Sequence, residues 1–210
     1  MDLATMRAIV RRELKDEDEQ NYRWSDDELD RHIARALSEL SEASPLPAKA
    51  TLQTTPGSRE IDISSLTDRV MIEAVEYPIN RFPPHYQQFS LWGDTITLFG
   101  DEIPDGSNCY IYYGKLHTLD SQTSTIPTKL EDLLAAGACG YAAIAWATYA
   151  INRVNVGGEG TPREFLAWGE ERLSYFRREL KRLGRRSRVR VRSLYYPYYP
   201  RQSKSTDYGP

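Results

Sequence analysis

Residues 130–150 read LEDLLAAGACGYAAIAWATYA, a stretch in which small side chains predominate. Small side chains let neighbouring helices approach from every side, so we expect this segment to be the central helix of a bundle. Pro127 precedes it, and Thr128 with Glu131 has the spacing of a capping box, which predicts where the helix begins. The stretch therefore predicts the element around which the other helices pack.

The same stretch is close to the length of a membrane span, which is the alternative interpretation. Residues 133–151 contain no charged side chain over 19 positions. Most of these positions are Ala, Gly, Tyr or Thr, and Asp132 and Arg153 bracket the segment closely. We therefore expect a buried helix and no association with a membrane. The charged, amphipathic N-terminal segment is not expected to be a signal peptide.

Three further amphipathic segments complete the predicted bundle. Residues 3–14 carry apolar side chains at helical spacing. The second segment begins at Ser25, which forms a capping box with Glu28. The last begins at Pro162, since proline is favoured at the first helical position, and Gly184 is placed to end it.

Between the second and third helices, β-branched and aromatic residues alternate with polar ones. Residues 51–119 predict about four or five short strands, and the Gly93-Asp94 pair predicts a hairpin turn. The expected fold class is α+β and mainly α: a four-helix bundle with an antiparallel β insertion between helices 2 and 3 and an extended C-terminal arm. The expected divisions are 1–50 (N-terminal helical pair), 51–119 (β-rich insertion), 120–184 (helical pair completing the bundle) and 185–210 (arm).

Charge is unevenly divided along the chain, whose net charge is −3. Residues 185–210 contain seven Lys or Arg against one Asp, whereas residues 1–184 contain 29 acidic and 20 basic side chains. Five of the 14 tyrosines also lie in this last segment. A segment of this composition cannot form a core by itself, so we expect an extended arm that binds a partner.

Three interpretations of the arm remain open. Arg and Tyr are the residues that dominate protein contacts, which favours a protein partner. Arg pairs with phosphates and Tyr stacks on bases, so a nucleic acid is the alternative, although the acidic body argues against it. The third interpretation is a solvated tail without a function. The candidate contact residues are Arg188, Arg190, Arg192, Tyr195, Tyr196, Tyr198 and Tyr199.

The chain carries no recognisable enzyme motif, so we expect neither catalysis nor a cofactor or metal. The three histidines are His32, His85 and His117. No two of them have metal-binding spacing, and His32 is expected at the surface. Cys109 and Cys139 are expected to be reduced, buried thiols. The acidic run 16–19 lacks the spaced ligands of a calcium loop and is expected to be a solvated linker.

The order of these motifs resembles a known family. The opening Asp2–Arg7, the segment Arg23–Asp30 (RWSDDELD) and Ala34–Leu40 are similar to head–tail adaptor (connector) proteins of tailed bacteriophages. The segment Tyr110–Tyr113 followed by Ile126–Leu134 and an Ala-rich helix is similar as well. The resemblance covers residues 1–184, and the arm matches no motif of the family.

The resemblance implies a virion structural protein without catalytic residues. Such proteins form a homo-oligomeric ring, typically twelve-fold, on the portal protein at the portal vertex. The ring extends the channel through which packaged DNA passes without sequence-specific binding, and it offers a platform to tail or further connector proteins. The resemblance also implies that the arm contacts the portal or a neighbouring subunit. The expected location is the head–tail interface of the virion, with assembly in the host cytoplasm.

Overall fold

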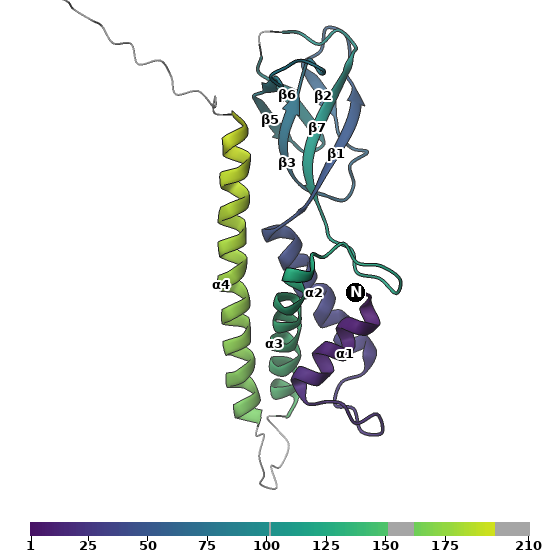
Figure 1. The fold of residues 1–210 in the computed structure, drawn as a ribbon, viewed down its shortest axis with the longest axis vertical. Coiled ribbons are helices and arrows are strands. Elements are labelled where there is room, and N and C mark those ends of the chain that lie inside the picture. Colours follow the sequence, from purple (N-terminus) through teal and green to yellow (C-terminus); the bar gives the residue numbers. More distant parts are fainter. Residues whose placement is uncertain (101, 151–161, 196–210) are drawn as a thin grey trace, which may run out of the picture. The chain divides into compact units, whose positions relative to one another are not determined.

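The computed structural model describes residues 1–100, 102–150 and 162–195, with side chains described as far as residue 187. Its contacts divide the chain into two compact units (Figure 1). The helical unit consists of Met1–Leu46 and Lys115–Gly184. The β unit is built from Pro47–Gly114.

The helices begin where local signals place them, with one exception. Their bounds are α1 Leu3–Leu14, α2 Asp26–Ala43, α3 Glu131–Ala150 and α4 Pro162–Tyr195. Ser25 and Glu28 form the predicted capping box at the start of α2. The capping box predicted at Thr128 is absent, because a 3-10 turn over Thr128–Leu130 precedes α3 and its N-cap, Pro127, has no hydroxyl.

The C-terminal helix is longer than predicted. Gly184 does not end α4, which continues to Tyr195 without a break. The prediction of an extended arm from residue 185 was therefore wrong for Arg185–Tyr195, whose backbone is helical. Arg has a high helix propensity and the one glycine costs only about 1 kcal/mol, so a helix already packed on its neighbours continues through it. Residues 196–210 lie outside the described part.

The core of the helical unit surrounds α3. In Figure 1, α3 lies between α4 and the pair formed by α1 and α2. Thirteen of its 20 residues are buried, and they occur on every side of the helix. Thr128–Ala150 is long and apolar enough to cross a membrane, but 72% of its apolar window is buried inside the structure. That burial is typical of a core helix.

Two glycines allow the backbones of α3 and α4 to meet. A Cβ atom added at Gly140 would lie 2.7 Å from Cγ of Leu173 and 3.1 Å from the carbonyl oxygen of Gly169. A Cβ atom added at Gly169 would lie 3.1 Å from the carbonyl oxygen of Gly140. Gly137 gives similar room to the ring of Phe176, which is fully buried. The α3–α4 contact therefore requires glycine at these positions.

The β unit contains two antiparallel sheets. One has the strand order β1-β7-β3-β4, and the other has the order β2-β6-β5. The bounds are β1 Leu46–Gln53, β2 Glu60–Asp62, β3 Arg69–Glu76, β4 Tyr86–Gln87, β5 Phe89–Trp92, β6 Thr95–Leu98 and β7 Asn108–Lys115. The predicted hairpin is confirmed: Trp92 pairs with Thr95 across a turn in which Gly93 has a φ of 57°.

The predicted fold class was wrong, because a four-helix bundle with a small insertion is not what the chain forms. Strands make up 22% of the structure, and the β unit has a hydrophobic core of its own. That core includes Ile61, Ile63, Ile96, Leu98 and Ile111, each at most 2% exposed. A segment that buries its apolar side chains in this way is a separate unit rather than a projection from a bundle.

The glycine contact between α3 and α4 generates a paired prediction. Gly140→Ala should lower the free energy of unfolding of the helical unit by about 1–3 kcal/mol, because the new Cβ overpacks against a backbone oxygen. Gly184→Ala should raise it by about 0.5–1 kcal/mol, since alanine is the better helix former and only Ala43 O, at 3.8 Å, is near. Urea denaturation followed by tryptophan fluorescence measures both. Equal effects from the two substitutions would contradict the contact.

Candidate interaction surfaces

A buried ion-pair network fixes the corner between α1 and α2. Arg11 donates hydrogen bonds to Oδ2 of Asp16 at 2.7 Å, to Oδ1 of Asp26 at 2.7 Å and to the carbonyl oxygen of Trp24 at 3.0 Å. Asp16 also accepts a hydrogen bond of 2.7 Å from the backbone N–H of Arg23. The Asp16 side chain is only 2% exposed. The expectation of a solvated linker over residues 16–19 was therefore wrong at its first residue.

A second arginine extends this network towards solvent. Arg7 donates two hydrogen bonds to the carboxylate of Asp30, at 2.8 and 3.0 Å, and one of 2.7 Å to Asp26. The hydrogen bond from Arg11 is the main cause that holds the pKa of Asp26 below its usual range. The hydrogen bond to Asp30 raises the pKa of Arg7. Together these bonds fix the angle at which α2 leaves α1.

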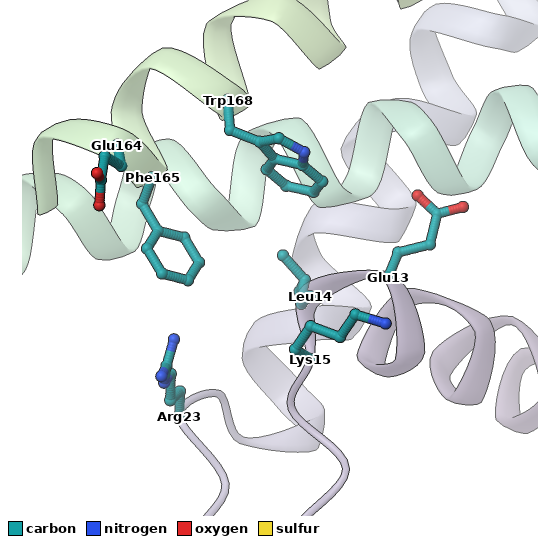
Figure 2. A pocket seen from close by; sticks show the side chains of 7 residues that line it. All are labelled: Glu13, Leu14, Lys15, Arg23, Glu164, Phe165 and Trp168. Atoms are coloured by element: carbon teal, nitrogen blue, oxygen red, sulfur yellow. The ribbon is translucent and has the colours of Figure 1, made fainter. Parts of the chain in front are cut away.

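An aromatic pocket of about 520 Å³ opens beside this corner (Figure 2). Phe165 and Trp168 of α4 form one wall, and Leu14 of α1 forms another. Glu13, Lys15, Arg23 and Glu164 supply its charged groups. An apolar wall with charges around it suits an apolar side chain of a protein partner.

A cluster of tilted aromatic rings supports the wall of this pocket. The centroid of Phe165 lies 4.7 Å from that of Trp146 and 6.4 Å from that of Trp24. The guanidinium of Arg23 lies 5.2 Å from the centroid of Phe165, within the range of a cation–π contact. The indole N–H of Trp24 donates to the carbonyl oxygen of Ala142 at 3.2 Å, which ties the rings to α3.

The β unit exposes apolar side chains of its own. Phe82 is 98% exposed, and Trp92, beside the turn of the β5–β6 hairpin, is 89% exposed. Phe99 and Ile103 are also exposed. Isolated exposed apolar residues are ordinary, but a nearly fully exposed Trp and Phe in one small unit are typical of a contact surface.

Tyrosines line one face of the four-stranded sheet. Nζ of Lys49 lies 3.3 Å from the ring centroid of Tyr110. Tyr112 donates a hydrogen bond of 2.6 Å to Glu76, and its ring meets that of Tyr86 edge-on at 5.9 Å. Burial and the bond to Glu76 raise the pKa of Tyr112. These contacts order the face into a single polar and aromatic surface.

The structure describes only part of the predicted contact set. Arg188, Arg190, Arg192 and Tyr195 lie in the last turns of α4, where the backbone alone is described. Tyr196, Tyr198 and Tyr199 lie outside the described residues. Sequence reasoning missed the pocket of Phe165 and Trp168, although their spacing on an amphipathic helix was visible.

Two of the three histidines and both cysteines are buried in the packed interior of the chain. His32 is buried, which corrects the expected surface position. His117 is buried too, and its ring nitrogens lie 3.0 Å from the carbonyl oxygen of Ser44 and 3.1 Å from that of Thr125. Cys109 and Cys139 are free and buried, as predicted. Among the described residues, no group of three His, Cys, Asp or Glu side chains could hold a metal ion.

The comparison with protein families identifies the chain. The model of the SU10 adaptor protein family matches residues 1–194, which include every described strand and helix except the last residue of α4, Tyr195. The chain belongs to the SU10 adaptor protein family. The predicted resemblance to phage head–tail adaptors is thereby confirmed. No curated protein matches the chain significantly.

Membership of this family defines the role of the chain in broad terms. It is a structural adaptor protein of a bacteriophage, located in the virion, and it interacts with head or tail components. The role of the family is structural rather than enzymatic. The contact surfaces of this SU10 adaptor are therefore the first candidates for its functional sites.

The buried network at the α1–α2 corner generates a stability prediction. Arg11→Met should lower the free energy of unfolding of the helical unit by about 3–5 kcal/mol, because it leaves the Asp16 carboxylate buried without its cation. Arg12→Met is the matched control. Its ion pair with Glu17, at 3.7 Å between exposed side chains, should contribute less than about 1 kcal/mol. Urea denaturation measures both variants, and similar losses would show that the network is not what holds the corner.

Buried His32 generates a pH prediction. Burial, with help from the charge of Arg31, holds the pKa of His32 below its ordinary value. The unfolded chain therefore binds more protons below about pH 6.5, so the helical unit should lose stability as the pH falls. His32→Met should flatten this dependence between about pH 7.5 and 5.5, measured by urea denaturation at each pH. An unchanged slope would exclude His32 as its source.

Proposed function

We propose that the protein forms a ring on the portal vertex, extends the DNA channel and provides the platform to which the tail attaches. The observation that carries this proposal is the family match over residues 1–194. The match includes both units, so both belong to the adaptor role. We propose that the ring contains twelve copies of the chain and assembles in the host cytoplasm.

The division into two units supports a joining role. An adaptor must bind two different neighbours, and each unit here has its own core. Each also has its own apolar contact surface: the pocket of Phe165 and Trp168 in the helical unit, and exposed Phe82 and Trp92 in the β unit. Two surfaces on separately packed units suit the portal protein on one side and tail or connector proteins on the other.

The charge of the chain supports a channel through which DNA slides. Residues 1–184 contain more acidic than basic side chains. A basic lining would hold the phosphates of packaged DNA, whereas an acidic one lets the duplex pass without specific binding. The ring therefore binds proteins and lets nucleic acid through.

We assign the portal or neighbouring-subunit contact to the end of the chain. The proposed residues are Arg188, Arg190, Arg192, Tyr195, Tyr196, Tyr198 and Tyr199. Support comes from their composition, since Arg and Tyr are enriched where protein contacts are strongest. The helical backbone as far as Tyr195 adds further support, because a helix carries side chains to a partner at a low entropic cost.

A truncation series tests this assignment. Removal of residues 185–210 should leave the unfolding of the remaining chain unchanged but abolish its attachment to portal particles of the same phage, seen by negative-stain imaging. Removal of residues 196–210 alone separates the Tyr-rich end from the helical Arg segment. If every truncated chain still forms a ring on the portal, the adaptor role stands but the contact is not made by residues 185–210.

Nucleic acid is the alternative partner of this segment. If the full chain does not associate with the portal, a DNA titration at several salt concentrations distinguishes the alternative. An affinity that falls steeply with salt, and that is lost on removal of residues 185–210, would favour DNA binding through the arm.

A further inference from the structure

A basic groove of about 730 Å³ runs along α4 where it faces α2 and α3. Arg35 of α2 and Arg177, Arg178 and Lys181 of α4 line it, and Glu170 is the only carboxylate in its lining. The ring centroid of Tyr141 lies 4.0 Å from the guanidinium of Arg35, and the hydroxyl of Tyr141 donates a hydrogen bond to Glu39 of α2. The groove therefore has an excess of positive charge within a helical unit that carries 20 acidic and 16 basic side chains.

Three of the four cations, Arg177, Arg178 and Lys181, form no ion pair with a carboxylate among the described residues. Arg35 lies 4.0 Å from Glu39, and Arg177 donates to the hydroxyl oxygen of Tyr141 at 3.5 Å. The guanidinium of Arg178 lies 5.7 Å from the ring centroid of Tyr175. No ion pair within the described part of the chain involves Lys181, which is exposed. Unpaired, exposed cations in a groove suit an acidic occupant.

The same unit presents an acidic loop elsewhere on its surface. Glu17, Asp18 and Glu19, called here the acidic loop, are all exposed. The only ion pair of the loop in the described structure joins Glu17 to exposed Arg12, with 3.7 Å between Oε1 and Nε. Buried Asp16 anchors its first turn through Arg11, so the loop does not have to be ordered on binding.

Within one chain the acidic loop and the groove are built from different residues, and no residue of the loop lines the groove. Two different complementary patches on one subunit generate a head-to-tail contact, which closes into a ring when the rotation between subunits allows it. We propose that the acidic loop of one copy binds in the basic groove of the next copy. This inference rests on the proposed ring and names the residues that hold neighbouring copies together.

A second copy fits the groove better than DNA does. Glu170 in the lining would repel phosphates, and the surrounding unit has an excess of acidic side chains. The apolar side chains of Ile144 and Leu173, which also line the groove, suit a folded protein loop.

Charge reversal tests the contact on the full chain mixed with portal particles of the same phage. The groove variant is Arg178→Glu with Lys181→Glu, and the loop variant is Glu17→Lys with Glu19→Lys. Each should weaken ring formation about a hundredfold, measured as copies bound per portal by native mass spectrometry. The matched control is Arg31→Glu with Arg163→Glu, two exposed arginines outside the groove, which should assemble like the unchanged chain.

An equimolar mixture of the two variants is the decisive measurement. In an alternating ring each loop meets a groove of opposite charge, so the mixture should restore assembly to within a few-fold of the unchanged chain. Rings formed by either variant alone, or no rescue on mixing, would overturn the contact while leaving the adaptor role intact. Loss of DNA retention in the groove variant alone, with normal assembly, would assign the groove to nucleic acid. If the unchanged chain forms no ring, the proposed function fails and this contact fails with it.

Cross-linking gives an independent measurement of the same contact. A chain carrying both Glu19→Cys and Lys181→Cys should form a ladder of covalent multimers with a short bismaleimide after assembly on the portal. Chains carrying only one of the two cysteines should give no ladder, because both natural cysteines are buried. If the doubly substituted chain assembles into rings but gives only monomers after cross-linking, the proposal is overturned.

Discussion

The approach of α3 and α4 at Gly140 and Gly169 is the constraint on which the helical unit depends. Each glycine leaves room for the carbonyl oxygen of the other helix, 3.1 Å from the position of its missing Cβ. Because the backbones meet there, α4 covers the side of α3 that α1 and α2 leave open, and Phe176 fills the space beside Gly137. The groove and the aromatic pocket both use α4 as a wall, so their shapes depend on this contact as well.

The sequence predicted the features that depend on local chemistry. The Ser25 capping box, the Gly93-Asp94 hairpin, the buried cysteines and the central Ala-rich helix were all foreseen, because each depends on neighbouring residues or on composition. It failed where long-range packing outweighs a local signal. Gly184 resembles a helix stop, yet α4 continues through it. Asp16 resembles a solvated acid, yet it is buried, because Arg11 binds both its carboxylate and the carbonyl oxygen of Trp24, which lies 13 residues after Arg11.

The candidate surfaces also differ in how far the sequence alone could predict them. Composition singled out the Arg- and Tyr-rich end of the chain, but the pocket and the groove each combine residues from three segments that only the fold brings together. The number of strands was underestimated partly because β4 has only two residues, which is too short for a clear alternation. Strand β1 begins at Leu46, between Pro45 and Pro47, as an edge strand, where proline is tolerated.

The burial of both thiols matters for a virion, which passes from a reducing to an oxidising environment. A virion protein is made in a reducing cell and then persists in an oxidising medium. Burial raises the pKa of Cys109 to about 11 and raises that of Cys139 as well, so neither becomes a thiolate at neutral pH. The two residues also lie in different units of the chain. Because the thiolate is the form that reacts in disulfide exchange and with peroxides, burial protects both cysteines from oxidation when the particle leaves the host.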